Sequence, residues 1–272
     1  MENLWQRMTA VAQQASAQGQ LVIMPSEYEI IVEGGIDFVL RYAPHLGLKK
    51  ATGAALSDSS EQSLANPDNP FLHPDPALWV EALGQSHNLL LNKYSLLPLH
   101  GLITSQTFVE QSSLLNLADF NAIASVLDQV DGLIFYNSGP LAGASQAHRH
   151  FQLVPKDLGA GVLPVEGAVQ GSQQDPQQRI YPFVHRVYWL PNGQPETLLE
   201  AWQKLEYSWQ ACNLLITRQW MLVVPRAQAA FSGISINSLG FAGALLAKDL
   251  QELALIRRLG PLALLSQVCR AR

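Results

Sequence analysis

The stretch Phe135-Tyr-Asn-Ser-Gly-Pro-Leu-Ala-Gly-Ala-Ser-Gln-Ala-His-Arg-His-Phe-Gln-Leu-Val-Pro155 lies near the middle of the 272-residue chain and decides the predicted fold. An apolar segment ends at Tyr136, and small or polar residues follow it. From His148 onward, polar and apolar residues alternate. This pattern predicts two strands joined by a turn that is rich in small residues.

The second of these strands carries three polar side chains at alternate positions. Because successive side chains point to opposite faces of a strand, we expect His148, His150 and Gln152 to project together. Phe151 and Leu153 should then face the core. A neutral imidazole nitrogen is a good nucleophile near pH 7, and its bond to phosphorus is labile enough to pass the group on. The strand therefore predicts a nucleophilic histidine in a pocket wall.

The turn before this strand is suited to bind an anion. Residues 139–146 offer backbone N–H groups, unobstructed at Gly143, beside the Ser145 hydroxyl and the Asn137 amide. Such donors stabilise phosphate oxygens on which charge develops in a transition state. The chain has no P-loop, no Gly-x-Gly-x-x-Gly segment and no His-Glu-x-x-His motif. The prediction of a phosphate site therefore depends on this turn.

Hydrophobic periodicity outlines the rest of the fold. Strands are predicted at residues 28–32, 36–42, 89–92, 99–104, 132–136, 148–154, 180–189, 213–217 and 219–224. Helices are predicted at residues 2–18, 117–130, 196–210 and 238–258. Residues 156–179 are expected to form a boundary or a long surface loop. Since strands and helices mix without regular βαβ alternation, the pattern favours an α+β fold with antiparallel strands.

The predicted helix at 238–258 contains a second set of candidate binding residues. Asn237, Gly240, Ala244 and Lys248 would share one helix face. A stripe of small residues that begins near a helix N-terminus and ends in a lysine suits a polyphosphate or an adenosine.

Composition limits the kinds of protein this chain can be. It has 17 Lys+Arg, 22 Asp+Glu, a net charge of −5 and 48% hydrophobic residues, which exclude intrinsic disorder and disfavour a nucleic-acid scaffold. Cys212 and Cys269 are too few for a disulfide framework or a four-cysteine zinc site. No apolar run is long enough for a membrane span. We expect a soluble cytoplasmic protein with neither nucleic acid nor membrane as partner.

The motifs together resemble the histidine-triad superfamily, and specifically the diadenosine tetraphosphate phosphorylase (ATP adenylyltransferase) family. The family signature is present as Asn137, Gly143-Ala144-Ser145 and His148-Arg149-His150-Phe151-Gln152. The resemblance covers most of the chain. It extends to segments at 69–72, 91–93, 131–137, 213–225 and 233–243.

The resemblance implies an α+β, histidine-triad-like fold, with a mainly antiparallel sheet flanked by helices and extended by a C-terminal α+β segment. Residues 1–165 would form the region that carries His-x-His-x-Gln. Residues 176–272 would form an ATP adenylyltransferase region that completes the substrate pocket.

The resemblance also implies a reaction. Diadenosine tetraphosphate would be cleaved with inorganic phosphate to ATP and ADP. Apart from the resemblance, we expect a divalent cation, Mg²⁺, bound with the polyphosphate, whose charge it would neutralise. His150 would attack an α-phosphorus and hold AMP covalently, and His148 would support it. Gln152 stands where hydrolytic members keep a third histidine. An amide cannot cycle a proton near pH 7, so transfer to phosphate is favoured over hydrolysis. We expect a monomer.

Substrate contacts carried over from the family lie in both halves of the chain. They are Lys49 or Lys50, Asn92, Lys93, Asn137, Gly143, Ala144, Ser145, Gln146, Gln152, Asn237 and Lys248. The sequence leaves open which of the two adjacent lysines makes the contact, and it indicates no metal ligands.

Other interpretations stay open on the sequence alone. The two motif histidines could be satisfied strand residues or zinc ligands, Asn237 a helix N-cap and Lys248 an exposed helix lysine. The enzyme could act on adenylyl sulfate, a nucleoside diphosphate or a sugar nucleotide, or the chain could be a non-catalytic dinucleotide sensor. The remaining histidines have no motif around them and are expected to be structural or surface residues: His45, His73, His87, His100 and His185.

Overall fold

The computed structural model describes residues 2–44, 69–97, 99–175, 177–191, 193–205 and 211–271. At its centre is an eight-stranded sheet in which every neighbouring pair is antiparallel. Its order from edge to edge is β10 (Arg186–Trp189), β12 (Trp220–Pro225), β11 (Cys212–Ile216), β8 (Gly132–Asn137), β9 (His150–Pro155), β7 (Gly101–Ser105), β5 (His87–Leu91) and β4 (Trp79–Leu83). The two halves of the chain thus share one sheet, joined where β8 pairs with β11.

A smaller sheet also combines strands from both halves. β2 (Glu27–Glu33) and β3 (Ile36–Tyr42) form a hairpin, whose turn uses positive φ at Gly34 and Gly35. β15 (Ala244–Ala247) pairs with β3 in the parallel sense. The described residues also form two short two-stranded pairs: β1 (Val22–Ile23) with β6 (Tyr94–Ser95), and β13 (Ala230–Phe231) with β14 (Ile234–Ser235).

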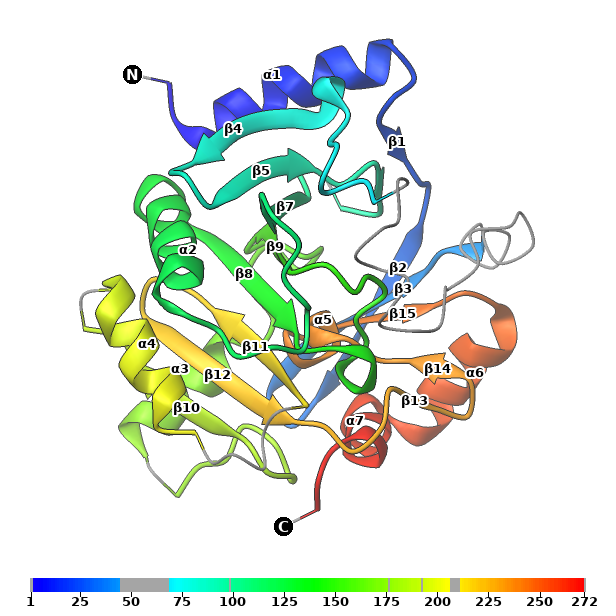
Figure 1. Ribbon diagram of the computed structural model, residues 1–272. Helices are drawn as coiled ribbons and strands as arrows, with labels where there is room; N and C mark the ends of the chain where they lie inside the picture. Colours follow the sequence, from blue (N-terminus) through cyan, green and yellow to red (C-terminus); the bar gives the residue numbers. More distant parts are fainter. Residues whose placement is uncertain are drawn as a thin grey trace.

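Two hydrophobic cores lie on opposite faces of the large sheet. On one face, α1 (Leu4–Ala17), α2 (Leu117–Gln129) and α4 (Pro195–Gln203) pack against apolar residues that include Tyr136, Phe151 and Leu153. On the other face are the small sheet, α3 (Glu166–Gln174), α5 (Ser238–Phe241), α6 (Leu250–Leu259) and α7 (Pro261–Val268). Figure 1 shows α2 beside α4 on one side and α6 with α7 at the C-terminal end. The expected α+β fold with a helix-flanked antiparallel sheet is confirmed.

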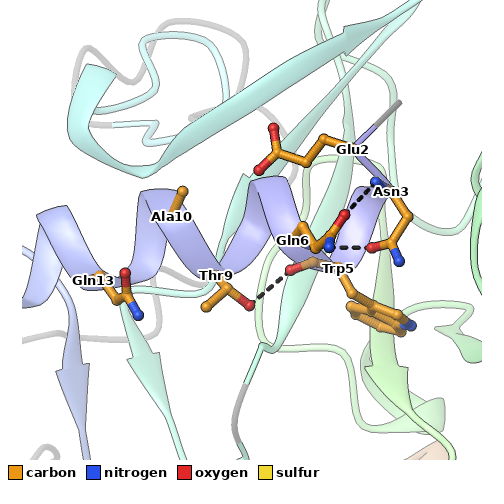
Figure 2. A pocket seen from close by; sticks show the side chains of 7 residues that line it. All are labelled: Glu2, Asn3, Trp5, Gln6, Thr9, Ala10 and Gln13. Atoms are coloured by element: carbon orange, nitrogen blue, oxygen red, sulfur yellow. Dashed lines mark hydrogen bonds between the residues drawn. The ribbon is translucent and has the colours of Figure 1, made fainter.

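The first helix illustrates how the sequence determines an element. Leu4 and Met8 are fully buried at helical spacing, as predicted. Figure 2 shows the capping box at its start, in which the side chains of Asn3 and Gln6 each bind the other's backbone N–H.

None of the helices within the described ranges is long and apolar enough to cross a bilayer.

The prediction of one long helix at 238–258 is wrong. α5 ends at Phe241, and Gly243 then adopts a φ of +94°, which a helix cannot contain. Residues 244–247 pair with β3 as β15, and a new helix, α6, begins at Leu250 behind the N-cap Asp249. Strand pairing with a distant segment has overridden local helix propensity here. The proposed helical face from Asn237 to Lys248 therefore does not exist.

Three other expectations need correction. Residues 156–179 were expected to form a boundary or a long surface loop; they are not simply a loop, because they contain the helix α3, whose Ala168 and Val169 are buried. Only residues 186–189 of the predicted strand 180–189 are a strand. The helix predicted at 196–210 runs from Pro195 to Gln203, and residues 206–210 lie outside the described residues. The division into regions 1–165 and 176–272 stays a prediction.

Candidate active site

The centre of the site lies where β8 and β9 separate. Phe135 pairs with Gln152, so continuing the antiparallel register places Asn137 opposite His150. The Gln111 side chain lies between these two strand ends. Its Nε2 donates to the Asn137 carbonyl at 2.8 Å and to the His150 carbonyl at 3.1 Å. Its Oε1 accepts from the His150 N–H at 2.8 Å. Gln111 thereby fixes both strand ends. Because residues opposite each other on neighbouring strands share a sheet face, the side chains of Asn137 and His150 project on the same side.

One of the two ring nitrogens of His150 is hydrogen-bonded within the described residues, and the other is not. Its Nδ1 lies 2.9 Å from the His148 carbonyl, which can only accept, so Nδ1 carries the proton and Nε2 has a lone pair. Nε2 has no hydrogen bond to any described residue, and the residue is 4% exposed. Burial lowers the pKa of His150 to about 4, and the hydrogen bond to the His148 carbonyl offsets only part of this effect. The ring is therefore neutral near pH 7, as a nucleophile must be.

His148 has both ring nitrogens engaged. Its Nε2 lies 2.8 Å from the Ser105 carbonyl, and its Nδ1 lies 3.0 Å from the Asn69 amide nitrogen. The rings of Phe71 and Phe108 pack edge-on against it, and the Phe71 ring centroid is also 5.3 Å from that of His150. This geometry suits the supporting role expected of His148, since its ring is fixed and its carbonyl orients His150.

Gln152 belongs to a chain of hydrogen bonds that the sequence analysis missed. Its Oε1 lies 2.8 Å from Nε2 of His100, and the other ring nitrogen of His100 lies 3.3 Å from the Asn92 amide nitrogen. Burial lowers the pKa of His100 to about 4, so the neutral ring donates to Oε1. The Gln152 NH₂ group then has no hydrogen-bond partner among the residues that the structure describes. His100 was expected to be structural or on the surface. It lies beside the site because β7 pairs with β9, which no local spacing indicates.

Asn137 has a similarly defined orientation. Its Oδ1 accepts from the Ser238 N–H at 2.9 Å and from Asn213 Nδ2 at 2.8 Å. Its Nδ2 has no hydrogen bond within the part of the chain that the structure describes. The site face therefore holds two free amide NH₂ groups, on Asn137 and Gln152, beside a free imidazole nitrogen.

The turn differs from expectation in one respect. The Gly143 N–H donates to the Pro140 carbonyl at 2.9 Å, so it is not an open donor. The glycine is needed because its φ is +87° and a Cβ there would lie 2.5 Å from the Ile236 carbonyl oxygen. It lets the turn pack closely on residues 236–237. The N–H groups of Ser145 and Gln146, both exposed, have no backbone partner among the described residues and are the open donors of the turn.

The other predicted residues are spread more widely. Asn237 packs on Gly143 and caps α5, so its N-cap role is present. Lys93 is exposed, with Nζ 5.9 Å from the centre of the Tyr94 ring. Lys248 binds Glu252 at 2.6 Å and the Gly233 carbonyl at 3.1 Å, and no contact brings it to His150. Lys49 and Lys50 lie outside the described residues. Ala144 is half-buried in the turn.

The donor set of the site suits an anion better than a metal ion. Within the described residues, no group of three or more His, Cys, Asp or Glu side chains could hold a metal. Asn92 and His100 also line a small cavity of about 100 Å³, which is otherwise mostly apolar and includes Leu91, Leu97 and Leu99. An imidazole nucleophile and amide donors can together bind a phosphate ester and attack its phosphorus.

This antiparallel sheet, with His-x-His-x-Gln on a central strand beside a turn of small residues, is typical of histidine-triad nucleotide-binding proteins. A family model described as "Ap4A phosphorylase N-terminal domain" matches residues 1–170, and one described as "ATP adenylyltransferase C-terminal domain" matches residues 179–271. The chain belongs to the Ap4A (diadenosine tetraphosphate) phosphorylase family.

Relatives from Saccharomyces cerevisiae agree with this assignment. Diadenosine 5',5'''-P1,P4-tetraphosphate phosphorylase 2 is 27% identical over 93% of this chain and 89% of its own length. The crystal structure of yeast Ap4A phosphorylase Apa2 in complex with AMP superposes with a TM-score of 0.79 at 25% identity, covering 99% of this chain and 97% of that one. The Apa2 complex with Ap4A gives a TM-score of 0.76 at 25% identity, with 99% and 98% covered.

Proposed function

We propose that this protein cleaves diadenosine tetraphosphate by phosphorolysis and releases ATP and ADP. The observation that carries the proposal is a set of three groups on one sheet face that have no hydrogen-bond partner among the described residues: Nε2 of His150, Nδ2 of Asn137 and Nε2 of Gln152. A lone pair beside two amide donors is complementary to an electrophilic phosphorus with negatively charged oxygens. Membership of the family, and relatives named for this activity, support the choice of substrate.

In the first step, Nε2 of His150 attacks the phosphorus next to one adenosine. The new N–P bond forms as the bond to the bridging oxygen breaks, and ATP leaves with that oxygen. The proton on Nδ1 stays in its bond to the His148 carbonyl, which stabilises the positive charge on the substituted ring. The amide groups of Asn137 and Gln152 donate to the non-bridging oxygens.

In the second step, an oxygen of inorganic phosphate attacks the same phosphorus. The N–P bond breaks, the electron pair returns to Nε2, and ADP leaves. Phosphate arrives already ionised, so it needs no general base. A water molecule would need one. Gln152 has no titratable proton near pH 7, which favours phosphate over water as the acceptor.

A divalent cation, Mg²⁺, completes the proposal. The described side chains of the site offer amides and an imidazole, and Mg²⁺ prefers carboxylate, phosphate and water oxygens. The polyphosphate oxygens would therefore be the main ligands of the ion, and its charge would help to neutralise the polyphosphate. Lys93 and Lys248, with Lys49 or Lys50, are the candidates for further contacts to the substrate. We also propose that the protein is a cytoplasmic monomer. Its buried free cysteines, Cys212 and Cys269, are consistent with a reducing compartment.

Product analysis tests the function. Purified protein is incubated with diadenosine tetraphosphate and Mg²⁺, with and without inorganic phosphate, and the nucleotides are separated. ATP and ADP in equal amounts, formed only with phosphate, are expected. ATP and AMP without phosphate would indicate hydrolysis, and binding without products would indicate a sensor. Faster turnover of adenylyl sulfate or a sugar nucleotide would move the assignment to a related nucleotidyltransferase.

A further inference from the structure

We infer that Asn213, held by Arg226, is a positioning residue that orients the Asn137 amide so that its NH₂ group faces the reacting phosphate. No sequence motif pointed to either residue in this role. The inference rests on the proposed function, because it assigns the two residues to the binding of the substrate's α-phosphate.

The first argument is that hydrogen-bond donors surround one atom, Oδ1 of Asn137. Asn137 Oδ1 lies within hydrogen-bond distance of three donors: the backbone N–H of Ser238 at 2.9 Å, the hydroxyl of Ser238 at 2.8 Å and Nδ2 of Asn213 at 2.8 Å. The backbone N–H and the amide NH₂ can only donate. If the Asn137 amide were turned over, its own NH₂ would face these two donors. The network therefore selects the orientation with NH₂ toward the site.

The second argument fixes Asn213 in the same way. Nη1 of Arg226 lies 2.6 Å from Oδ1 of Asn213, and a guanidinium has no acceptor. The Asn213 oxygen must therefore face Arg226. Its Nδ2 is then directed at Asn137, and also at the carbonyl of Ala142 in the turn, at 2.8 Å. Arg226 thus fixes the orientation of the Asn213 amide, and Asn213 in turn fixes that of the Asn137 amide.

The third argument concerns Arg226 itself. Its side chain is almost completely buried, and among the described residues it has no carboxylate partner. Its other bonds go to backbone carbonyls, including Ile236 at 3.0 Å and Gln228 at 2.7 Å, and its guanidinium lies 5.5 Å from the ring centre of Phe241. A buried cation bound only to neutral acceptors is costly to maintain, which indicates a specific requirement. Its contacts fix both Asn213 and the segment before Asn237.

The sheet register connects this network to the nucleophile. Asn213 on β11 pairs with Asn137 on β8, and Asn137 lies opposite His150 at the start of β9. The three side chains are neighbours across three adjacent strands. Arg226 and Asn213 belong to the C-terminal half and His150 to the N-terminal half. The C-terminal half therefore orients a donor beside the nucleophile.

The test is a double-mutant cycle on kcat and KM for phosphorolysis of diadenosine tetraphosphate. Asn213→Asp replaces a donor with an oxygen that faces Asn137 Oδ1, while the carboxylate keeps its contact with Arg226 and so stays compensated. We expect kcat to fall about 100-fold with KM changed less than about 3-fold, because the lost contact strengthens in the transition state. Asn137→Ala should show a fall of similar size. Asn3→Asp, at the cap of α1, is the matched control and should leave kcat unchanged.

The double variant gives the decisive comparison. If Asn213 acts through Asn137, adding Asn213→Asp to Asn137→Ala changes kcat by less than about 2-fold. A full further fall in kcat in that background, or an unchanged kcat in the single Asn213→Asp variant, would overturn the inference. Ser238→Ala removes a hydroxyl that lies 2.8 Å from this oxygen and 2.8 Å from the Tyr136 carbonyl, and it supplies the cycle if Asn213→Asp does not fold. A wild-type protein that releases no ATP or ADP overturns the proposed function instead.

Discussion

Arg149 donates from Nη1 to Oδ2 of Asp119 over 2.6 Å, and this ion pair lies on the sheet face opposite His150. Arg149 is the residue between the two motif histidines, so strand alternation turns it toward α2, which carries Asp119. The same carboxylate group accepts from the Asn116 N–H at 2.8 Å and lies 3.2 Å from Nε2 of His87. Arg149 therefore anchors the start of β9, the strand that carries His150, to α2.

Substitution of Arg149 should be strongly destabilising. Arg149→Met leaves Asp119 buried without its cation, and we expect the free energy of unfolding to fall by about 3–5 kcal/mol. Urea denaturation followed by circular dichroism measures this. The control is Arg257→Ala, which removes an exposed ion pair to Glu29 and should leave the free energy of unfolding nearly unchanged. Equal losses in the two variants would contradict the anchoring role.

Gly143→Ala should impair catalysis through the turn. The new Cβ would lie 2.5 Å from the Ile236 carbonyl oxygen, so the turn must move away from Asn237. We expect a loss of about 1–3 kcal/mol in stability and at least about a 10-fold fall in kcat. Gly35→Ala is the matched control, since its φ is also positive at +77° but nothing lies within 4 Å of its Cβ. Its kcat should stay unchanged, and an unchanged kcat in Gly143→Ala would refute the argument.

Gln152→Glu tests the amide donor. The carboxylate can still accept from His100 but places a second, negatively charged oxygen where the NH₂ group was. We expect kcat/KM to fall by about 100- to 1000-fold, because an oxyanion donor is replaced by a repulsive group. Gln13→Glu makes the same change on an exposed face of α1 and should have no effect. Steady-state kinetics at saturating phosphate would decide, and activity near that of the wild type would contradict the assignment.

Stability should fall as the pH is lowered from 6.5 toward 4. Burial lowers the folded-state pKa of His100 and of His150 to about 4, below the value of 6.5 for an exposed histidine. In this window the unfolded chain binds protons that the folded protein does not, so acid favours unfolding. Each such histidine contributes a slope of about 1.4 kcal/mol per pH unit.

The variant His100→Asn provides the check on this pH dependence. Its free energy of unfolding is measured in urea at several pH values. Between pH 6.5 and 4 it should depend less steeply on pH than that of the wild type, because about one proton fewer is bound on unfolding. The same slope in both proteins would show that His100 is not neutral in the folded state.

Local patterns predicted the centre of the site well. Alternation placed Phe151 and Leu153 in the core and His150 with Gln152 on the opposite face, because a strand imposes this period whatever surrounds it. The strand pair at 213–217 and 219–224 and the helix at 117–130 are found within a few residues of the predicted ends.

Non-local pairing explains what the sequence could not show. His100 reaches Gln152 only because β7 and β9 are neighbours in the sheet, and Asn213 reaches Asn137 only through the pairing of β11 with β8. Gln111 lies 39 residues from His150 along the chain. The strand β15 was mistaken for part of a helix because its partner β3 is about 200 residues away in sequence. Spacing rules describe neighbours along the chain and contain no such information.

Trapping the intermediate tests the central claim most directly. The protein is incubated with diadenosine tetraphosphate labelled at the α-phosphorus, without inorganic phosphate, quenched in alkali and digested, and the labelled peptide is sequenced. We expect one adenylyl group on His150, which inorganic phosphate discharges as ADP, and no label in His150→Ala. Label on any other residue, or phosphorolysis by His150→Ala, would contradict the account.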